Sequence, residues 1–358
     1  MEQPEAASRV RVSVCVPTRH GSGRIGPLLR SLAGLEHDSF EVIVVDQSGD
    51  GATREVFDAI TAPDRRFRYV ASPTVGYSSA CNVAAARAEG RILAFTDDDC
   101  VARPEWLSRL EHAFALRPAP AAICGGVVAA EHDRALRAIP VFMPARRRLC
   151  QARWSLCGVP LMGANLAVDT RALAEVGGFD EALGPGAPLG SGADWDLAYR
   201  LLRGHRRVLI LPGNSIAHRG LRREGAELRG LLRRYAAGHG AICMKHLRMG
   251  DPVAVALLAT CLWQDGGRRL RWRNLLGLRR PTGLGCLAAF VRGMARASRL
   301  RLDGAACRLE PVSGRLAHPP IGLSSSAQIH GTVAHPCRDS NAPISTGSHS
   351  RTTRDRED

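Results

Sequence analysis

The 358-residue sequence contains no long apolar run. Its longest largely apolar stretch, residues 253–263, has eleven residues, whereas a helix needs about 20 to cross a bilayer. The first ten residues are polar and include acids, so they do not resemble a signal peptide. The sequence therefore predicts a cytoplasmic protein without a membrane span.

Paired cysteines are also absent. The eleven cysteines are scattered singly, with no CxxC pair and no spacing typical of a zinc finger. An odd number without such a framework is typical of reduced thiols in a cytoplasm rather than of a secreted disulfide scaffold. Most of these cysteines are expected to be small core residues.

Acidic residues are scarce in one part of the chain. Between residues 203 and 301 there are 21 Arg or Lys residues and four acids, a surplus of 17 against a net charge of +15 for the whole chain. The remainder is therefore slightly acidic. This asymmetry predicts a basic appendage that could meet anionic lipid, nucleic acid or a charged acceptor, beside a catalytic domain that is not basic.

The first 220 residues alternate apolar strands with amphipathic helices. The patterns predict helices at 25–35, 56–60 and 78–88, and strands at 11–16, 40–45, 67–70, 91–96, 121–128 and 208–211. Such alternation predicts an α/β fold with a mostly parallel central sheet flanked by helices. Beyond residue 220 the pattern becomes helical, at 227–249, 252–263 and 284–299.

Polar clusters follow three of the predicted strands, at 17–19 (PTR), 46–50 (DQSGD) and 97–99 (DDD). Ligands of open α/β sheets bind beyond the carboxyl ends of the strands. Three adjacent carboxylates repel one another unless a cation neutralises them, and hard oxygen ligands suit Mg²⁺ or Mn²⁺. The alternatives are a solvated acidic turn at 97–99 and a structural Asx turn at Asp46.

At this point the sequence resembles the family 2 glycosyltransferases, which have the GT-A fold of nucleotide-diphospho-sugar transferases. The resemblance rests on ordered segments at 14–19 (VCVPTR), 44–50 (VVDQSGD), 76–82 (GYSSACN), 95–99 (FTDDD), 163–165 (GAN), 176–180 (VGGFD) and 192–200 (GADWDLAYR). Each motif is weak alone, but their order and spacing over residues 10–220 are specific. The resemblance implies an inverting transferase that uses a nucleoside-diphosphate sugar.

The resemblance also implies roles for individual residues. The nucleotide-sugar pocket would be lined by Pro17, Thr18, Arg19, Asp46, Asn82, Asp97 and Asp98. Asp99 would be the main metal ligand, with His218 as a further one, and the ion would be Mn²⁺ or Mg²⁺. For Asn82 the alternative is a helix-surface amide, and for His218 a partly buried histidine with a hydrogen-bond partner.

Asp194 matches the catalytic base, which is normally the Asp of a Glu-Asp pair at the start of a helix. Here the Glu position is Ala193, a departure that removes a neighbouring acid. An acceptor hydroxyl is a poor nucleophile, so one carboxylate must take its proton. A single base opposite the leaving group implies one displacement with inversion. Asp196 could partly replace the missing Glu, or be an ordinary acid of a helix's first turn.

Two other classes of protein compete with the transferase. A nucleotidyltransferase would also use carboxylates and Mg²⁺, but its Gly-rich phosphate loop usually has a lysine nearby, and Lys245 is the only lysine here. A nucleic-acid-binding module is favoured by charge alone, so no nucleic acid is expected as a partner. A non-catalytic sugar-nucleotide-binding member is the third alternative, because of Ala193.

The expected organisation is a flexible amino-terminus (1–9), a GT-A domain (10–224), a basic helical region (225–301) and a disordered tail (302–358), rich in Ser, Thr, His and Pro. The expected donor is a UDP-sugar, with GDP and dTDP open, and the acceptor a saccharide or lipid-linked glycan of the cell envelope or a polysaccharide. The basic helices resemble segments that lie on the inner face of an anionic membrane, or they pack on the catalytic domain.

Overall fold

The computed structural model describes residues 11–130, 137–138, 141–157, 159, 161–220, 222–223, 226–265, 282–304 and 307–310. The predicted flexible amino-terminus and most of the predicted tail lie outside these residues. Within them, no helix is both long and apolar enough to cross a bilayer.

A nine-stranded sheet forms the centre of the molecule, in the order β3-β2-β1-β4-β9-β6-β10-β5, with β8 also paired to β10. Its strands are β1 (Val12–Thr18), β2 (Phe40–Asp46), β3 (Phe67–Ala71), β4 (Ile92–Phe95), β5 (Cys100–Ala102), β6 (Ala122–Ala129), β8 (Arg148–Cys150), β9 (Leu166–Asp169) and β10 (Val208–His218). The run β3-β2-β1-β4 is parallel, and β9 is antiparallel to both of its neighbours. The predicted mostly parallel sheet is confirmed.

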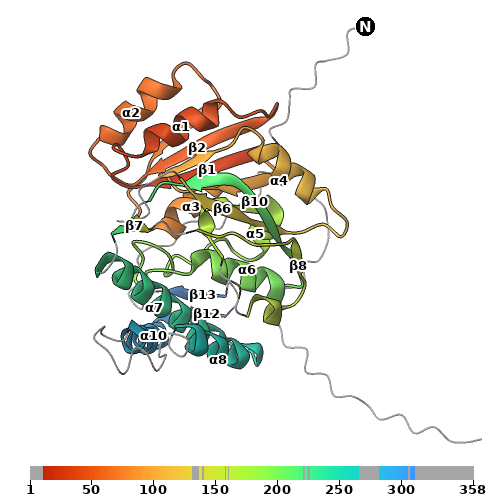
Figure 1. Cartoon of the computed structure of the whole chain (residues 1–358), viewed down its shortest axis with the longest axis vertical. Helices are drawn as coiled ribbons and strands as arrows, with labels where there is room; N and C mark the ends of the chain where they lie inside the picture. The colour runs from red at the N-terminus through yellow and green to blue at the C-terminus, as the bar shows by residue number, and fades with distance from the viewer. Residues whose placement is uncertain are drawn as a thin grey trace, which may run out of the picture.

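Helices flank this sheet on both faces (Figure 1). They are α1 (Ile25–Ala33), α2 (Ala52–Thr61), α3 (Tyr77–Ala85), α4 (Trp106–Phe114), α5 (Thr170–Glu175) and α6 (Ala193–Arg203), with short 3-10 turns η1 (Arg153–Leu156) and η2 (Gly163–Asn165). Both β1 and β2 are buried at every position. Continuous burial explains why these strands are unbroken apolar runs rather than alternating ones.

The predicted carboxyl-terminal helices are confirmed as α7 (Ala226–Arg248), α8 (Val253–Asp265) and α10 (Thr282–Ser298). They gather below α6 in Figure 1. Helices α7 and α10 cross backbone against backbone: a Cβ atom at Gly240 would lie 2.1 Å from the Phe290 carbonyl oxygen, and one at Gly293 would lie 1.9 Å from that of Ala237. Only glycine allows this approach.

The sequence patterns did not predict the short strands. Strands β5 and β8 have three residues each, which is too few for a period to be recognised. The pair β12 (Arg301–Asp303) and β13 (Arg308–Glu310) forms an antiparallel hairpin. Strands β7 (Arg137–Ala138) and β11 (Arg222–Arg223), which are far apart in the chain, pair antiparallel as a second small sheet. The predicted tail therefore begins too early, because Leu309 is buried and its N–H donates to Asp180 Oδ2.

Candidate active site

The ends of β1 and β4 are joined by a hydrogen-bonded carboxylate. Thr18 Oγ1 donates to Asp98 Oδ2 at 2.6 Å, and Arg24 Nε donates to Asp98 Oδ1 at 2.8 Å. A Cβ atom at position 21 would lie 2.1 Å from Thr18 Oγ1, so Gly21 is needed for the pair to form. Both oxygens of Asp98 thus accept hydrogen bonds within the protein, and its place in the nucleotide-sugar pocket stays a prediction.

Asp46 lies beside Thr18 at the end of β2, as the strand register requires. Its Oδ1 accepts hydrogen bonds from the Ser48 N–H and hydroxyl, and its Oδ2 accepts one from the Tyr69 hydroxyl at 2.5 Å. The side chain is buried. The Asx-turn alternative is therefore realised at Asp46, and its contact with a nucleobase stays a prediction.

The other members of the acidic triplet face the end of β10. His218 Nε2 lies 3.4 Å from Asp99 Oδ1 and 4.0 Å from Asp97 Oδ2. The Gly220 N–H donates to His218 Nδ1 at 3.1 Å, and a Cβ atom at position 220 would lie 2.5 Å from Asp99 Oδ2. The turn after β10 therefore brings the two predicted metal ligands together.

The ligand atoms at this point suit a divalent ion. Atoms of Asp99, Cys100 and His218 lie within 4.8 Å of one another. The carboxylate and imidazole suit Mn²⁺, whereas the thiol does not. Burial, followed by the charges of Asp97 and Asp99, raises the pKa of Cys100, so its thiol stays protonated. Because His218 Nδ1 accepts a hydrogen bond, the neutral ring carries its proton on Nε2, and metal ligation there requires the other tautomer.

Asp194 lies in the first turn of α6, after Gly192 in the left-handed region (φ 90°). The Trp195 N–H donates to its Oδ1 at 2.8 Å. Burial raises the pKa of Asp194, and the neighbouring His239 of α7 and backbone N–H groups oppose this shift. A carboxylate with a raised pKa is a better proton acceptor. Ala193, in place of the expected Glu, is buried against the protein.

Tyr77, the first residue of α3, lies near Asp97 of the acidic triplet and near Asp194 of α6. Its hydroxyl is buried beside the Cys81 thiol. Burial raises the pKa of Tyr77, and the charges of Asp97 and Asp194 both add to the rise. A Cβ atom at Gly163 would lie 3.0 Å from the Tyr77 hydroxyl and 3.7 Å from Asp194 Cβ. Asp97 and Asp194, 97 positions apart, therefore both lie near one phenol.

Three further residues were predicted to line the nucleotide-sugar pocket: Pro17, Arg19 and Asn82. Pro17 is buried within β1, and Arg19 is exposed, with its carbonyl accepting from Arg24 Nη2. The Asn82 amide donates to the Phe179 carbonyl and to Glu181, and accepts from the Phe179 N–H at 2.8 Å. Asn82 is thus not a surface amide, because it is buried and joins α3 to the 177–181 turn. Its contact with a nucleotide stays a prediction.

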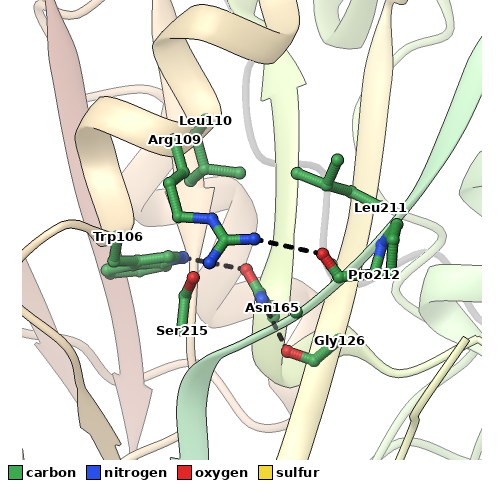
Figure 2. Close-up of a pocket in the computed structure, with 10 residues that line it drawn as sticks. Trp106, Arg109, Leu110, Gly126, Asn165, Leu211, Pro212 and Ser215 are labelled. Carbon is green, nitrogen blue, oxygen red and sulfur yellow. Dashed lines mark hydrogen bonds between the residues drawn. The ribbon is translucent and has the colours of Figure 1, made fainter. Parts of the chain in front are cut away.

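The pocket in Figure 2 belongs to the scaffold rather than to this site. Asn165 accepts from Trp106 Nε1 at 2.9 Å and donates to the Gly126 carbonyl, while Arg109 donates to the Pro212 carbonyl. None of the predicted site residues lines it. The Asn of the 163–165 motif therefore ties η2 to α4 and β6.

Three residues near the site were not predicted from the sequence: Arg24, Tyr77 and His239. Tyr77 stands inside one of the quoted motifs, where only Asn82 was chosen. His239 comes from α7, which was predicted as an appendage, and no local pattern indicates its proximity to Asp194. Helix α7 is therefore a wall of the site as well as part of the basic region.

The fold and the strand-end acids agree with the GT-A type that the motifs predict. Residues 13–157 match the model of glycosyl transferase family 2. The resemblance predicted from the motifs is thereby confirmed over this part of the chain. No curated protein sequence matches the chain.

Solved structures share the fold. TarS 1–349 of S. aureus is 17% identical, with a TM-score of 0.57, and the match covers 83% of this chain and 85% of that one. TarS in complex with UDP-GlcNAc is 18% identical, with a TM-score of 0.55 and the same coverage. The mannosyltransferase PcManGT of Pyrobaculum calidifontis, in complex with GDP-Man and Mn²⁺, is 20% identical, with a TM-score of 0.54, covering 83% and 89%.

Proposed function

We propose that the protein transfers a sugar from a nucleoside-diphosphate sugar to an acceptor hydroxyl with inversion, with Asp194 as general base. The observation that carries the proposal is that the charges of Asp97 and Asp194 both act on the enclosed Tyr77 hydroxyl, with Gly163 packed against that hydroxyl and Asp194. It connects the acidic strand end with the carboxylate of α6. A donor diphosphate at the strand end would therefore lie close to a base.

The strand-end residues would hold the donor. Asp99, with His218, would bind Mn²⁺ or Mg²⁺, which when bound neutralises the charge that develops on the diphosphate leaving group. Thr18 and Arg24 keep Asp98 fixed, so the turn that carries the triplet is pre-organised. Of the similar solved structures, TarS was solved with UDP-GlcNAc, and PcManGT with GDP-Man and Mn²⁺. We propose a UDP-sugar as donor, with GDP- and dTDP-sugars as alternatives.

Asp194 would take the proton of the acceptor hydroxyl as it attacks. A buried carboxylate with a raised pKa holds that proton more readily than an ordinary aspartate does. No second carboxylate of the described first turn is available for covalent catalysis, because Asp196 is fully buried in ion pairs. A single displacement with inversion follows from one base.

The test begins with thermal shifts of the protein with UDP-, GDP- and dTDP-sugars, with and without Mn²⁺. Transfer and donor hydrolysis are then measured for the wild type, for Asp194→Asn, and for Asp58→Asn, an exposed acid of α2 that serves as the matched control. We expect a loss of about 10²- to 10⁴-fold for Asp194→Asn only. Full activity of Asp194→Asn would refute the base.

Two other outcomes would replace the proposal. Donor binding by the wild type without turnover would indicate a non-catalytic sugar-nucleotide-binding protein. Pyrophosphate release from a nucleoside triphosphate and a sugar phosphate would indicate a nucleotidyltransferase.

We further propose that the acceptor is a saccharide or lipid-linked glycan of the cell envelope or of a polysaccharide, reached at an anionic membrane surface. Large apolar side chains are exposed on the last helices, with Trp263 of α8 at 64% and Val291 of α10 at 59%. Exposed arginines follow Val291 in the sequence, at 292, 296 and 299. Apolar and cationic groups together favour adsorption to anionic lipid.

Co-sedimentation with phosphatidylglycerol vesicles tests the membrane contact. We expect binding that weakens for Trp263→Ser and with added salt, and little binding to phosphatidylcholine vesicles. Equal binding to both vesicle types, or none, would refute the membrane proposal and leave the transferase untouched.

A further inference from the structure

One face of α7 lies along the segment that opens α6. A Cβ atom at Gly238 would lie 2.7 Å from the Ser191 carbonyl oxygen, and one at Gly192 would lie 2.6 Å from Ile242 Cδ1. Lys245 Nζ lies 2.6 Å from Asp196 Oδ1. Positions 238, 242 and 245 follow one another at helical spacing. The contact therefore runs along a single stripe of α7, on both sides of Asp194.

The last contact of this stripe is a fully buried ion cluster. Lys245 is unexposed, and its ammonium donates to Asp180 at 2.7 Å as well as to Asp196. Arg200 Nε donates to the other oxygen of Asp196 at 2.8 Å, and both of these side chains are buried too. Two acids and two bases thus share one dry site. His246 Nε2 lies 3.3 Å from Asp196 Oδ1, and burial lowers the pKa of this histidine.

The cluster connects three distant parts of the chain. Asp180 belongs to the 177–180 turn, Asp196 to α6 and Lys245 to α7. The β12–β13 hairpin joins through the Leu309 N–H, which donates to Asp180 Oδ2. Figure 1 shows α7 and the hairpin beneath α6. A buried cation with two anionic partners fixes distances more strictly than apolar contact does, because leaving either carboxylate unpaired is costly.

A second buried acid holds the far end of α6. Asp251, between α7 and α8, accepts hydrogen bonds from Tyr199 at 2.9 Å and from Arg203 at 3.1 Å. Arg153 of η1 adds a third, at 2.9 Å. Helix α6 is therefore held at both ends by charges, and Lys245 acts at the end that carries Asp194.

We infer that Lys245 is a positioning residue for transfer: it sets the angle of the first turn of α6, and so the place of the Asp194 carboxylate. This inference rests on the proposed role of Asp194 as base. Lys245 itself touches neither donor nor acceptor. A carboxylate displaced by about 1 Å loses roughly 10²-fold in rate, whereas the ion pairs of the cluster join α6, α7 and the 177–180 turn rather than the ends of β1, β2 and β4. The predicted signature is a lower kcat with an unchanged KM for the donor.

The test uses the double variant Lys245→Met with Asp180→Asn in the full-length protein. It removes one positive and one negative charge, so Asp196 and Arg200 remain a neutral pair, and the Asn oxygen can still accept the Leu309 N–H. Hydrolysis of UDP-GlcNAc and GDP-mannose with Mn²⁺ supplies kcat and KM. We expect kcat to fall ten- to hundredfold, with KM within twofold of the wild type.

Ser13→Ala is the matched control for lost stability. Ser13 is buried at the opposite end of β1, where its hydroxyl donates to Glu41 and accepts from the Gly90 N–H. Its loss should lower the melting temperature without changing kcat. Wild-type kcat in the folded double variant, or a double variant that does not fold, would overturn the positioning role. If Asp194→Asn keeps its activity, the proposed base is wrong; if Asp194→Asn is inactive and the double variant fully active, only the role of Lys245 falls.

Discussion

The two halves of the site hold their carboxylates by different means. At the strand ends, Asp46 and Asp98 are held by hydroxyl groups, backbone N–H groups and the half-exposed Arg24. At the α6–α7 contact, Asp196 is held by Lys245 and Arg200, all of them unexposed. The first arrangement is partly exposed, with Arg24 at 47%, whereas the second is fully buried. We expect the first half to govern donor binding and the second to govern stability and the placement of the base.

The largest effect expected from this contrast is on stability. Asp196→Asn leaves Arg200 without its charged partner in a buried site, which typically costs about 3–5 kcal/mol. Asp98→Asn at the strand ends should cost about 1.5–3 kcal/mol, because only hydrogen bonds to a charged group are weakened. Urea unfolding of both variants measures the difference. Equal costs would mean that the two halves are not held differently.

Losses of activity, unlike losses of stability, should be larger at the strand ends than at the α6–α7 contact. Asp99→Ala should lower transfer by about 10²- to 10³-fold, the loss typical of one electrostatic contact in the transition state. It should also abolish the thermal shift caused by Mn²⁺. Stability should change by less than about 1 kcal/mol, because removing one of three adjacent acids also relieves repulsion. An unchanged response to Mn²⁺ would place the ion elsewhere.

Two aspartates in the first turn of α6 should respond oppositely to pH. Burial raises the pKa of Asp194, so its stabilising contribution is present below the ordinary aspartate pKa and is lost as pH rises through the raised one. Burial alone would also raise the pKa of Asp196, but Lys245 and Arg200 lower it. Its contribution is present above the ordinary pKa and is lost as pH falls.

Asp194→Asn should therefore raise the melting temperature at pH 7, and Asp196→Asn should lower it. The Asp194→Asn difference should shrink toward pH 4, near the ordinary aspartate pKa, whereas the Asp196→Asn difference should persist at pH 4 and shrink only at lower pH. Thermal unfolding between pH 4 and pH 8 measures both variants. A lower melting temperature of Asp194→Asn at pH 7 would show that its charge is not disfavoured by burial.

The smallest effect is expected at an exposed pair close to α6. Arg206 Nη2 lies 2.6 Å from Glu175, but both side chains are almost half exposed. Arg206→Ala should therefore cost only about 0.2–1 kcal/mol, as exposed ion pairs do. Measured beside Asp196→Asn, it separates the contribution of burial from that of charge. A cost near that of Asp196→Asn would remove burial as the explanation.

The positions of the strand-end residues could be predicted because the sheet itself places them. Parallel strands end at one edge, so a polar residue after each apolar run falls beside the next, as Thr18 and Asp46 do. The resemblance added Asp194 and His218. Which oxygens are already engaged could not be predicted, because Tyr69 and Arg24 reach Asp46 and Asp98 from neighbouring elements.

The α6–α7 half could not be predicted. Asp196 was considered as a substitute for the missing Glu or as an ordinary first-turn acid, and it is a buried partner of Lys245, 49 positions away. No period or motif encodes such a pairing. The one available signal was composition: a single lysine in a chain with 48 arginines occupies a place where a compact ammonium fits between two carboxylates.

The β12–β13 hairpin has a practical consequence for shortening the protein. The match to the family model ends at residue 157, and the basic helices could be taken for removable additions. Yet the Leu309 N–H donates to Asp180 Oδ2, the same oxygen that accepts from Lys245. A chain that stops before Arg308 loses that donor and uncovers the ion cluster, so any truncated form meant for enzymology should retain residues through Glu310.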